Sequence, residues 1–327
     1  MTLDNILEPI KLQQLEFEKC FESMLESEIG IIKDVLSYLS NNKGKRLRPS
    51  LMILVASSIV RNQLIPERIY SNAAMVELLH TATLVHDDVV DDSMERRGQP
   101  SVNAVWNNKI SMLIGDYLFA HAMQPAFRNK DYDFLSILSS TIELMSEGEL
   151  LAIQQSRNLE FTEDLYYKII YAKTASLISA ACHISATVCT TSDIIKNTFR
   201  EYGKNVGMAF QIRDDIFDYV SDSTTIGKPV GNDLKEHKLT LPIIFALSNV
   251  SQTKKEEILN LIKLNNMNEA NIFNIIDFTI ENGGVDYATQ KANEFVNKAI
   301  SCLDVLEDSN FKISLINFAK FVVSRDK

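Results

Sequence analysis

Residues that interrupt helices are rare in this chain. Its 327 residues include only 11 glycines and 7 prolines, and no proline occurs from residue 126 to residue 228. Apolar residues recur at spacings of three and four along most of the sequence, for example from Ser71 to Asp87, which is the repeat of a helix with one buried face. Alternating, strand-like patterns with turn dipeptides are scarce. Because proline and glycine destabilise helix interiors, the sequence predicts an all-α fold.

Four short stretches rich in glycine, proline and polar residues mark the predicted loops. They lie at residues 41–50, 96–100, 224–233 and 281–284. No change of composition and no long linker divides the chain, so we expect residues 1–327 to form a single domain of ten or more helices. Several helical segments are apolar on nearly every face, which predicts that they are buried in a helical bundle.

Composition and charge restrict the class of function. Hydrophobic residues make up 46% of the chain and charged residues 23%, as in an ordinary globular protein with a sizeable core. The net charge of -10 argues against a general nucleic-acid binder, because phosphate backbones require a basic surface. An acidic surface is common among soluble proteins, and it also suits a protein that binds divalent cations.

Cysteine spacing and the N-terminal sequence favour a cytoplasmic protein. The four cysteines are far apart and form no CxxC pair, so neither a zinc site nor a disulfide framework is predicted. A reducing compartment is the usual setting for such a chain. The first ten residues include acidic side chains and no basic region before an apolar run, which predicts no secretory signal. The apolar stretch at residues 51–60 is too short to span a bilayer.

Two acidic motifs of the same form occur in the chain. DDVVD begins at Asp87 and DDIFD begins at Asp214, and each one ends an apolar helical pattern. Residues four apart lie on one face of a helix, so the first and last aspartates of each motif should point the same way. A single motif of this kind is often only a solvated helix end. Its repetition, each time before a basic loop, favours a functional site.

The residue types in these motifs indicate binding of a diphosphate through Mg²⁺. Carboxylate oxygens without interleaved histidine or cysteine suit Mg²⁺, which typically bridges one or two carboxylates to substrate phosphates. Arg96 and Arg97 follow the first motif and Lys228 follows the second. An arginine fork matches phosphate oxygens. Each motif with its loop therefore predicts a diphosphate held by metal on one side and by a cation on the other.

A third basic cluster predicts a second diphosphate site. The sequence GKRLRP at residues 44–49 places Lys45 and Arg48 three apart, where they share a face if a helix begins there. Alone, the cluster would be read as an exposed basic turn. A later glycine-containing loop carries Lys228 and Lys238, and its alternating charges suit a loop that closes over charged ligands.

Glu77 and His80 form an ExxH pair, a spacing that also occurs in di-iron carboxylate sites. Di-iron carboxylate bundles require two such pairs, and no other histidine has a glutamate three positions before it. The sequence therefore disfavours a di-iron site. His80 lies two turns before Asp87 on the same helical face, where it would either donate to a phosphate or be a satisfied core histidine.

Seven stretches of the sequence together resemble one family. They are GKRLRP, ELLHTATLVHDDVVDDSMERRGQPSVN, GDYLFA, EGEL, KTASL, GMAFQIRDDIFDY and GKPVGNDLKEHKLTLP, in this order between residues 44 and 242. On them the chain resembles the trans-type polyprenyl diphosphate synthases, most closely the long-chain, octaprenyl-type bacterial members. The C-terminal FVVSRDK is also similar. One departure is His237, where the family usually has glycine. We expect it to be tolerated and to alter the geometry around Lys238.

The resemblance implies a fold, a reaction and an assembly. The implied fold is an isoprenoid-synthase-type helical bundle around a deep central cavity, usually in a homodimer. The implied prenyltransferase reaction is the head-to-tail (1'-4) condensation of isopentenyl diphosphate with an allylic diphosphate. The implied cofactor is Mg²⁺, with three ions per active site. A transient membrane contact is expected for release of an apolar product.

The resemblance also assigns roles to individual residues. The implied Mg²⁺ ligands on the allylic diphosphate are Asp87, Asp91 and Asp214, with Asp88, Asp215 and Asp218 in support. Direct contacts with that diphosphate are implied for Arg96, Lys173 and Lys228. The residues implied in binding isopentenyl diphosphate are Lys45, Arg48, His80 and Arg97, with Arg46 nearby, and Lys238 is a further substrate contact. Thr174 and Gln211 would flank the developing carbocation.

Two small residues before the first motif bear on product length. Ala82 and Thr83 lie about one helical turn, or 5.4 Å, before Asp87. In the family a bulky aromatic residue there stops growth early, so the small pair favours a long product of about C30 to C50, nearest C40, for isoprenoid quinone side chains. The alternative is that small residues only allow close helix packing.

Three other functions stay open at this point. A short-chain synthase that makes farnesyl or geranylgeranyl diphosphate is the nearest alternative. A class I terpene cyclase shares the metal–diphosphate chemistry but needs no second diphosphate site, so Lys45, Arg48 and Arg97 argue against it. A non-catalytic partner subunit is a third possibility, although such subunits tend to lose aspartate motifs and both are intact here.

Overall fold

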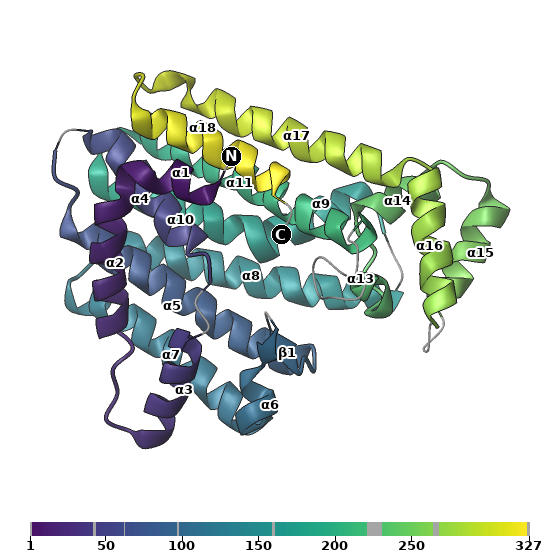
Figure 1. Ribbon diagram of the computed structural model, residues 1–327, viewed down its shortest axis with the longest axis horizontal. Coiled ribbons are helices and arrows are strands. Elements are labelled where there is room, and N and C mark those ends of the chain that lie inside the picture. The colour runs from purple at the N-terminus through teal and green to yellow at the C-terminus, as the bar shows by residue number, and fades with distance from the viewer. Residues whose placement is uncertain are drawn as a thin grey trace. The chain divides into compact units, whose positions relative to one another are not determined.

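A computed structural model describes residues 2–41, 44–61, 63–96, 98–158, 161–220, 231–263 and 268–325. Helices account for nearly all of its regular structure (Figure 1), and the predicted all-α fold is confirmed. The helices group into two compact units, each assembled from separate segments of the chain. Unit 1 contains residues 1–139, 180–200 and 306–315, and unit 2 contains residues 140–179, 201–305 and 316–327. That residues 1–327 form a single domain stays a prediction.

Unit 1 contains most of the N-terminal elements. Its helices are α1 (Leu3–Leu7), α2 (Lys11–Ser23), α3 (Gly30–Asn41), α4 (Leu47–Val60), α5 (Glu67–Val90), α6 (Val102–Trp106) and α7 (Asn108–Arg128), with a 3₁₀ turn at Glu8–Ile10. Two short strands, β1 (Glu95–Arg96) and β2 (Gln99–Pro100), form an antiparallel hairpin after α5. The first part of α8 (Tyr132–Asn158) and parts of α10 (Ser176–Cys189), α11 (Asp193–Val220) and α18 (Asn310–Ser324) complete the unit.

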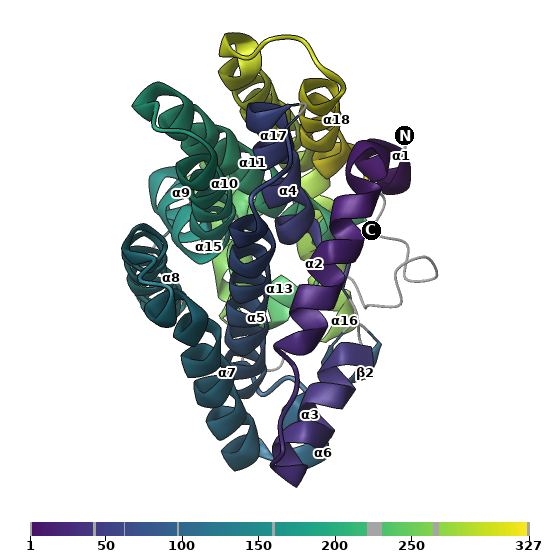
Figure 2. The same cartoon turned by 90° about the vertical axis from the view of Figure 1, so that its left-hand side faces the viewer.

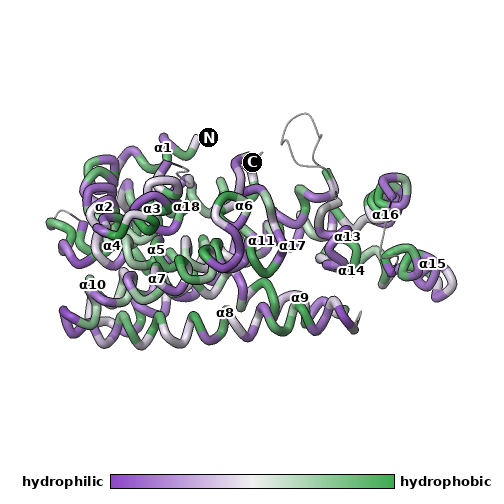
Figure 3. The backbone as a smooth tube through the Cα atoms, turned by 90° about the horizontal axis from the view of Figure 1, so that it is seen from below, coloured by the Kyte–Doolittle hydropathy of each residue, from purple (hydrophilic) through white to green (hydrophobic). Residues whose placement is uncertain are grey.

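Unit 2 contains the rest of α8, α10, α11 and α18 and the elements of the C-terminal half. These are α9 (Glu163–Ile170), a π-helical turn (Tyr171–Ala175), α13 (Asn232–Lys235), α14 (Leu241–Ser248), α15 (Gln252–Ile262), α16 (Glu269–Glu281), α17 (Gly284–Cys302) and a 3₁₀ turn (Leu303–Val305). In α15 the first six residues are hydrophilic and apolar residues follow (Figure 3), and Ile258 and Ile262, four residues apart, are buried. This is the pattern of a helix with one buried face.

Helix α5 is the central element of unit 1. It packs against α2, α4 and α7 (Figures 1 and 2). Its residues from Asn72 to Leu79 are all buried, as the sequence predicted for helices that are apolar on most faces. The helix that carries the first aspartate motif at its C-terminal end is thereby held by three neighbouring helices.

The turn that ends α5 has a specific geometry. Asp92 has a φ of +48°, its N–H donates to the Val89 carbonyl at 3.4 Å, and the Ser93 N–H donates to the Asp88 carbonyl at 2.9 Å. These two bonds are the pair that closes a helix when a left-handed residue follows it. The chain then enters the β1–β2 hairpin and brings Arg96 back to the helix end.

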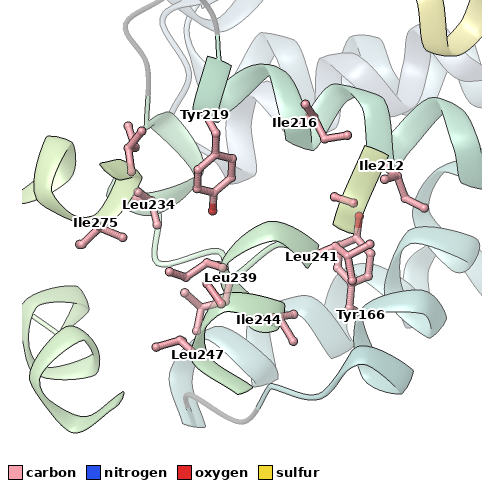
Figure 4. Close-up of a cluster of buried hydrophobic side chains, with 14 of the residues drawn as sticks. Tyr166, Ile212, Ile216, Tyr219, Leu234, Leu239, Leu241, Ile244, Leu247 and Ile275 are labelled. Atoms are coloured by element: carbon pink, nitrogen blue, oxygen red, sulfur yellow. The ribbon is translucent and has the colours of Figure 1, made fainter. Parts of the chain in front are cut away.

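The core of unit 2 lies under the second aspartate motif. Helix α11 directs Ile212, Ile216 and Tyr219 into a buried cluster with Leu234 and Leu241 (Figure 4). The spacing of four and three residues places these apolar side chains on one face of α11. The neighbouring faces near the end of the helix are left for the aspartates.

A π-helical turn interrupts the helical run from α9 to α10, and the sequence did not predict it. Two glycines allow close approach to it: a Cβ on Gly148 would lie 2.5 Å from the Ala172 Cβ, and one on Gly207 would lie 2.5 Å from the Ala175 Cα. Short π segments often occur at functional sites, and this one carries Lys173 and Thr174.

One described segment is long and apolar enough to cross a membrane by length and composition. It is Glu163–Cys189, and 78% of its most apolar window is buried within the protein. A core helix of a soluble protein passes the same test, so the segment carries little weight as a membrane span.

Two of the predicted loop boundaries require correction or fall outside the structure. The loop expected at residues 41–50 is wrong in its second half, because α4 begins at Leu47, where apolar residues and a proline near the helix start favour helix. The loop at 224–233 lies mostly outside the described residues. The hairpin at 95–100 and the break at 282–283 agree with the other two predictions.

Candidate active site

The first aspartate motif lies at the C-terminal end of α5. The N–H of Asp91 donates to the Asp87 carbonyl at 2.8 Å, so the helical relation predicted for these two residues is confirmed. Asp87 is half-buried and Asp91 is exposed. Asp88, in contrast, is 3% exposed, and Arg96 Nε donates to its Oδ1 at 2.6 Å. The second aspartate of the motif is thus held by a protein donor, and the first and last are less buried.

A small pocket adjoins this motif in unit 1. Its volume is about 70 Å³, and its lining includes Arg46, Glu77, His80, Asp88 and Arg96. The structure therefore brings together residues that the sequence assigned to both diphosphates. Arg97 lies outside the described residues, so its predicted role in binding isopentenyl diphosphate is untested.

Arg46 is engaged within the protein. Its backbone has a φ of +50°, its Nη1 lies 2.9 Å from Glu77 Oε1, and its Nε lies 3.5 Å from Glu18 Oε1. The guanidinium also covers the Phe21 ring at 4.2 Å. Glu77, considered above as half of an ExxH pair, is the carboxylate partner of Arg46. These contacts fix the turn that carries Lys45 and leads into Arg48.

The second aspartate motif, near the end of α11, repeats this arrangement. Asp215 is buried, and it accepts from the Tyr166 hydroxyl at 2.6 Å and from Gln211 Nε2 at 2.8 Å. Asp214 and Asp218 are half-buried. Again the second aspartate is held by protein donors, whereas the first and fifth lie on more open faces of the helix.

Arg325 forms an ion pair with Asp214. Its guanidinium covers the Phe210 ring at 3.9 Å, and it also donates to the Phe210 carbonyl at 3.3 Å. Burial lowers the pKa of Arg325, and the negative charge of Asp214 opposes that change. The chain thus supplies a cation to the first aspartate of the second motif.

Hydrogen bonds connect the π-helical turn to the second motif. Thr174 Oγ1 donates to Gln211 Oε1 at 2.7 Å, and the amide nitrogen of Gln211 donates to Asp215. These two bonds fix the orientation of the Gln211 amide. Beside them, Lys173 Nζ lies 2.5 Å from Glu149 Oε2. Lys173 and Thr174 thus both lie on the π turn, one short segment of unit 2.

The segment after residue 230 folds onto Asp218. The N–H of Asp233 donates to Asp218 Oδ2 at 2.9 Å, and the N–H of Gly231 donates to the Asp218 carbonyl at 3.1 Å. Lys238 follows in the same segment, with its Nζ 2.5 Å from Glu236 Oε2. Lys228, the other predicted cation of this loop, lies outside the described residues.

The electrostatics of both helix ends favour a bound cation. A helix C-terminus has a negative dipole end that disfavours carboxylates, yet both motifs lie there and neither helix has a basic residue in its last turn. Burial raises the pKa of Asp215 to about 7. The negative charges of Asp214 and Asp218 also raise this pKa, whereas the hydrogen bonds from Tyr166 and Gln211 lower it. Burial and then the charges of Asp215 and Asp218 raise the pKa of Asp233.

The donor set fits Mg²⁺. Within the described residues, no three His, Cys, Asp or Glu side chains are close enough to form a metal site from protein atoms alone. Mg²⁺ ordinarily takes only one or two carboxylates, with water and substrate phosphates as its other ligands. Hard carboxylate oxygens on the outward faces of the motifs meet that requirement.

The two predicted chain-length residues differ in burial. Ala82 is fully buried, whereas Thr83 is half-buried and its hydroxyl donates to the His80 carbonyl at 2.8 Å. The other residues that proved to support the site were not found from the sequence: Glu77 as a partner of Arg46, Glu149, Tyr166 and Arg325. The sequence offered a signal for Glu77, Glu149 and Arg325, because each lies in a stretch that resembles the family, and it offered none for Tyr166.

Comparison with known proteins identifies the family. The polyprenyl synthetase family model matches residues 29–278. The chain is 32% identical over 327 residues to the octaprenyl diphosphate synthase of Escherichia coli (100% of each chain) and 33% identical to a short chain isoprenyl diphosphate synthase of Methanothermobacter thermautotrophicus (97% of each chain). A crystal structure of polyprenyl synthase from Caulobacter crescentus, complexed with calcium and isoprenyl diphosphate, matches with a TM-score of 0.92 and 31% identity, covering 100% of this chain and 98% of that one.

The chain therefore belongs to the polyprenyl synthetase family. Its activity is that of a prenyltransferase that elongates polyprenyl diphosphates, as its sequence predicted, and the isoprenoid-synthase-type helical fold is likewise confirmed. Isoprenyl diphosphates are its substrates.

Proposed function

We propose that the protein performs a Mg²⁺-dependent, head-to-tail condensation of isopentenyl diphosphate with an allylic diphosphate. The proposed product is a long all-trans polyprenyl diphosphate of about C30 to C50, nearest C40. Its proposed use is in isoprenoid quinone side chains. The observation that carries the proposal is the repeated construction of the two motifs. In each, the second aspartate is buried against protein donors, and the first and fifth are less buried and lie near a helix C-terminus. The Caulobacter crescentus relative, complexed with a divalent cation and isoprenyl diphosphate, supports this chemistry.

The proposed residue roles are those that the resemblance to the family implies, and the burial of the aspartates supports part of them. Asp87, Asp91 and Asp214 are assigned to Mg²⁺, with three ions per active site. Asp88, Asp215 and Asp218 support them, and the burial of Asp88 and Asp215 favours that division. The cations assigned to the allylic diphosphate are Arg96, Lys173 and Lys228. Those assigned to isopentenyl diphosphate are Lys45, Arg48, His80 and Arg97, with Lys238 as a further substrate contact and with Arg46 positioning the turn beside them.

The reaction needs stabilisation of a leaving group rather than a strong base. Bound Mg²⁺ supplies Lewis-acid stabilisation of the diphosphate that leaves. Arg96 and Lys173 add positive charge to the same group. The bond between the allylic C1 and the diphosphate oxygen breaks, and the isopentenyl double bond attacks the allylic cation. A proton then leaves the new chain, and the departing diphosphate is the proposed acceptor. The Thr174 hydroxyl and the Gln211 amide, which are oriented by hydrogen bonds, flank the cation.

Product length is proposed from the small residues on α5. With Ala82 and Thr83, the helix presents no aromatic ring about one turn before Asp87, so growth is not stopped after the first additions. Relatives of both long-chain and short-chain type are equally similar to this chain, so overall identity does not decide the length. The side chains near the first motif carry the assignment.

Assembly and location are also proposed. Two apolar side chains of α7, Met112 and Leu113, are 42% and 60% exposed, which suits a contact with a second copy of the chain in a homodimer. We place the protein in the cytoplasm with transient membrane contact, because each buried CH₂ of a long product adds about 0.8 kcal/mol to the cost of release into water. The mass of the purified protein by light scattering, with and without a Leu113→Glu substitution, tests the dimer.

One incubation tests the proposed reaction. The purified protein is mixed with Mg²⁺, isopentenyl diphosphate and farnesyl diphosphate, and the products are read by mass spectrometry after removal of the phosphates. A ladder that ends near C40 is expected, and omission of Mg²⁺ in the presence of EDTA should abolish it. Products that stop at C20 would indicate a short-chain synthase. Elongation only after a second protein is added would indicate a partner subunit.

A further inference from the structure

His237 occupies a backbone position that usually requires glycine. It follows the short helix α13, and its φ is +56°. Its N–H donates to the Leu234 carbonyl at 3.1 Å, and the N–H of Lys238 donates to the Asp233 carbonyl at 2.8 Å. This pair of bonds is the helix-ending motif in which the residue after the cap adopts the left-handed conformation. A residue with a bulky side chain is strained there and glycine is not.

The imidazole of His237 makes a contact that glycine cannot make. Its Nδ1 lies 2.7 Å from the carbonyl oxygen of Ile262, the last residue of α15. A carbonyl only accepts, so Nδ1 carries the proton and donates. Carbonyls in the last turn of a helix lack partners within that helix, and a donor from another element stabilises them. On the other side of the turn, the His237 carbonyl accepts from Ser156 Oγ of α8 at 3.5 Å.

The segment that contains His237 is attached to the second motif at its other end. Asp218 accepts from the N–H of Asp233, and its carbonyl accepts from the N–H of Gly231. The residues from Gly231 to Lys238 are thus fixed at two points, by α11 through Asp218 and by α15 through His237. Lys238 is the next residue after the second point.

We propose that His237 is a positioning residue for Lys238: its imidazole anchors to α15 the turn that carries Lys238, and so sets where the ammonium group meets a substrate diphosphate. The inference rests on the proposed function of Lys238 as a substrate contact. The strained backbone supports it, because a histidine that only filled space would be less stable here than glycine, whereas a histidine that donates to Ile262 recovers that loss through the hydrogen bond.

Three substitutions separate the hydrogen bond from the strain. In His237→Asn, the side-chain amide nitrogen is the same number of bonds from Cα as Nδ1, and asparagine tolerates the left-handed conformation. His237→Asp has the same shape but presents only acceptors to the Ile262 carbonyl. His237→Gly removes both the strain and the anchor. If anchoring matters, the asparagine variant resembles the wild type and the other two do not.

The test measures steady-state kinetics and amide hydrogen exchange on the full-length protein with Mg²⁺, isopentenyl diphosphate and farnesyl diphosphate. In the aspartate and glycine variants, we expect KM for one diphosphate substrate to rise about fivefold or more, which is the loss of roughly one hydrogen bond, and kcat to change by less than about twofold. Amides in residues 231–240 should exchange faster in those two variants, and the asparagine variant should restore both readouts.

The outcomes are distinguishable from a failure of the proposed function. If the wild-type protein elongates no substrate, the proposed function fails, and hydrogen exchange still tests the anchor. If the wild type is active and the glycine or aspartate variant keeps a wild-type KM, the positioning role is wrong. A loss of kcat alone, with no change in KM, would also contradict it, because a misplaced substrate contact weakens binding.

Discussion

In each aspartate motif, the second aspartate lies in a different environment from the first and the fifth. Asp88 and Asp215 are buried and satisfied by protein donors, so their carboxyl groups are fixed in place. Asp87, Asp91, Asp214 and Asp218 lie on more open faces. Six aspartates that look alike in the sequence thus fold into two environments, and burial separates Asp88 and Asp215 from the other four.

Asp215 makes the stability of the metal-free protein depend on pH. Burial, opposed by hydrogen bonds from Tyr166 and Gln211 and assisted by neighbouring aspartates, raises its pKa to about 7 from an ordinary value of 3.8. Between these values the folded protein binds more protons at this residue than the unfolded chain, so the free energy of unfolding falls as pH rises. We expect Asp215→Asn to stabilise the metal-free protein at pH 8 by on the order of a few kcal/mol, with little effect at pH 4.

Thermal denaturation in EDTA at several pH values measures this effect. Asparagine retains an amide in place of the protonated acid, so Tyr166 and Gln211 keep partners. The exposed Asp133→Asn substitution is the matched control and should leave the pH dependence unchanged. If Tm changed with pH in the same way in Asp215→Asn and in the wild type, ionisation of Asp215 would not lower the free energy of unfolding, and the prediction would be wrong.

Product length is a second property set by single residues. Thr83 is half-buried, so a phenyl ring at this position has room to project from α5. Thr83→Phe should therefore shorten the product with little loss of stability, and Thr83→Ser should not change it. Ala82→Phe should also shorten the product, but because Ala82 is fully buried, overpacking should cost about 1–3 kcal/mol in the free energy of unfolding. Mass spectra of the products, measured beside melting curves, test both statements. An unchanged product in both phenylalanine variants would contradict the role of this position.

At the scale of elements, the π-helical turn depends on close approach by its neighbours. Gly148 on α8 and Gly207 on α11 lie against the turn that carries Lys173 and Thr174. The turn, the two helices and the hydrogen bond from Thr174 to Gln211 therefore act as one arrangement. Any change that separates α11 from the turn should disturb Gln211 and, through it, Asp215.

Gly207→Ala tests this arrangement. The added methyl would meet backbone and Cβ atoms of Ala175, which cannot rotate away, so α11 must shift. We expect a loss of about 1–3 kcal/mol in stability and a larger fractional loss of activity than the loss of folded protein explains. Gly30→Ala is the control, because a Cβ there meets nothing within 4 Å. Denaturant unfolding and kcat, measured for both variants, provide the comparison. Equal activity in the two variants would show that the glycine is not required for the turn.

For the whole molecule, local patterns and long-range contacts were not equally accessible from the sequence. The three- and four-residue apolar spacing predicted the helices, and the spacing within DDVVD and DDIFD placed the aspartates correctly on helix ends. The partners of those aspartates were missed, because Tyr166 is 49 residues from Asp215 and Arg325 is 111 residues from Asp214. No periodicity encodes such contacts. The π turn was missed for a related reason, since it depends on glycines from two other helices.

Binding of Mg²⁺ and diphosphate should stabilise the whole protein cooperatively. Both aspartate clusters lie near helix C-termini, where repulsion within each cluster and the helix dipole oppose folding. Mg²⁺ typically bridges carboxylates to phosphates rather than filling an all-protein site. Saturation with ligand at about 100 times its Kd adds roughly 2.7 kcal/mol of stability. We therefore expect Mg²⁺ with inorganic diphosphate to raise Tm by several degrees, and by more than the sum of the two shifts measured separately.

The double substitution Asp87→Asn and Asp214→Asn is the decisive comparison for that synergy. It removes one outward carboxylate from each motif and leaves the buried Asp88 and Asp215 in place, so the fold should persist. In EDTA the variant should have a Tm below that of the wild type, because Asp214→Asn removes the carboxylate that pairs with the buried Arg325, and it should lose most of the joint shift from Mg²⁺ and diphosphate. A joint shift of wild-type size would mean that the stabilising ions bind elsewhere, and purely additive shifts would mean that metal and diphosphate do not bind as a bridged unit.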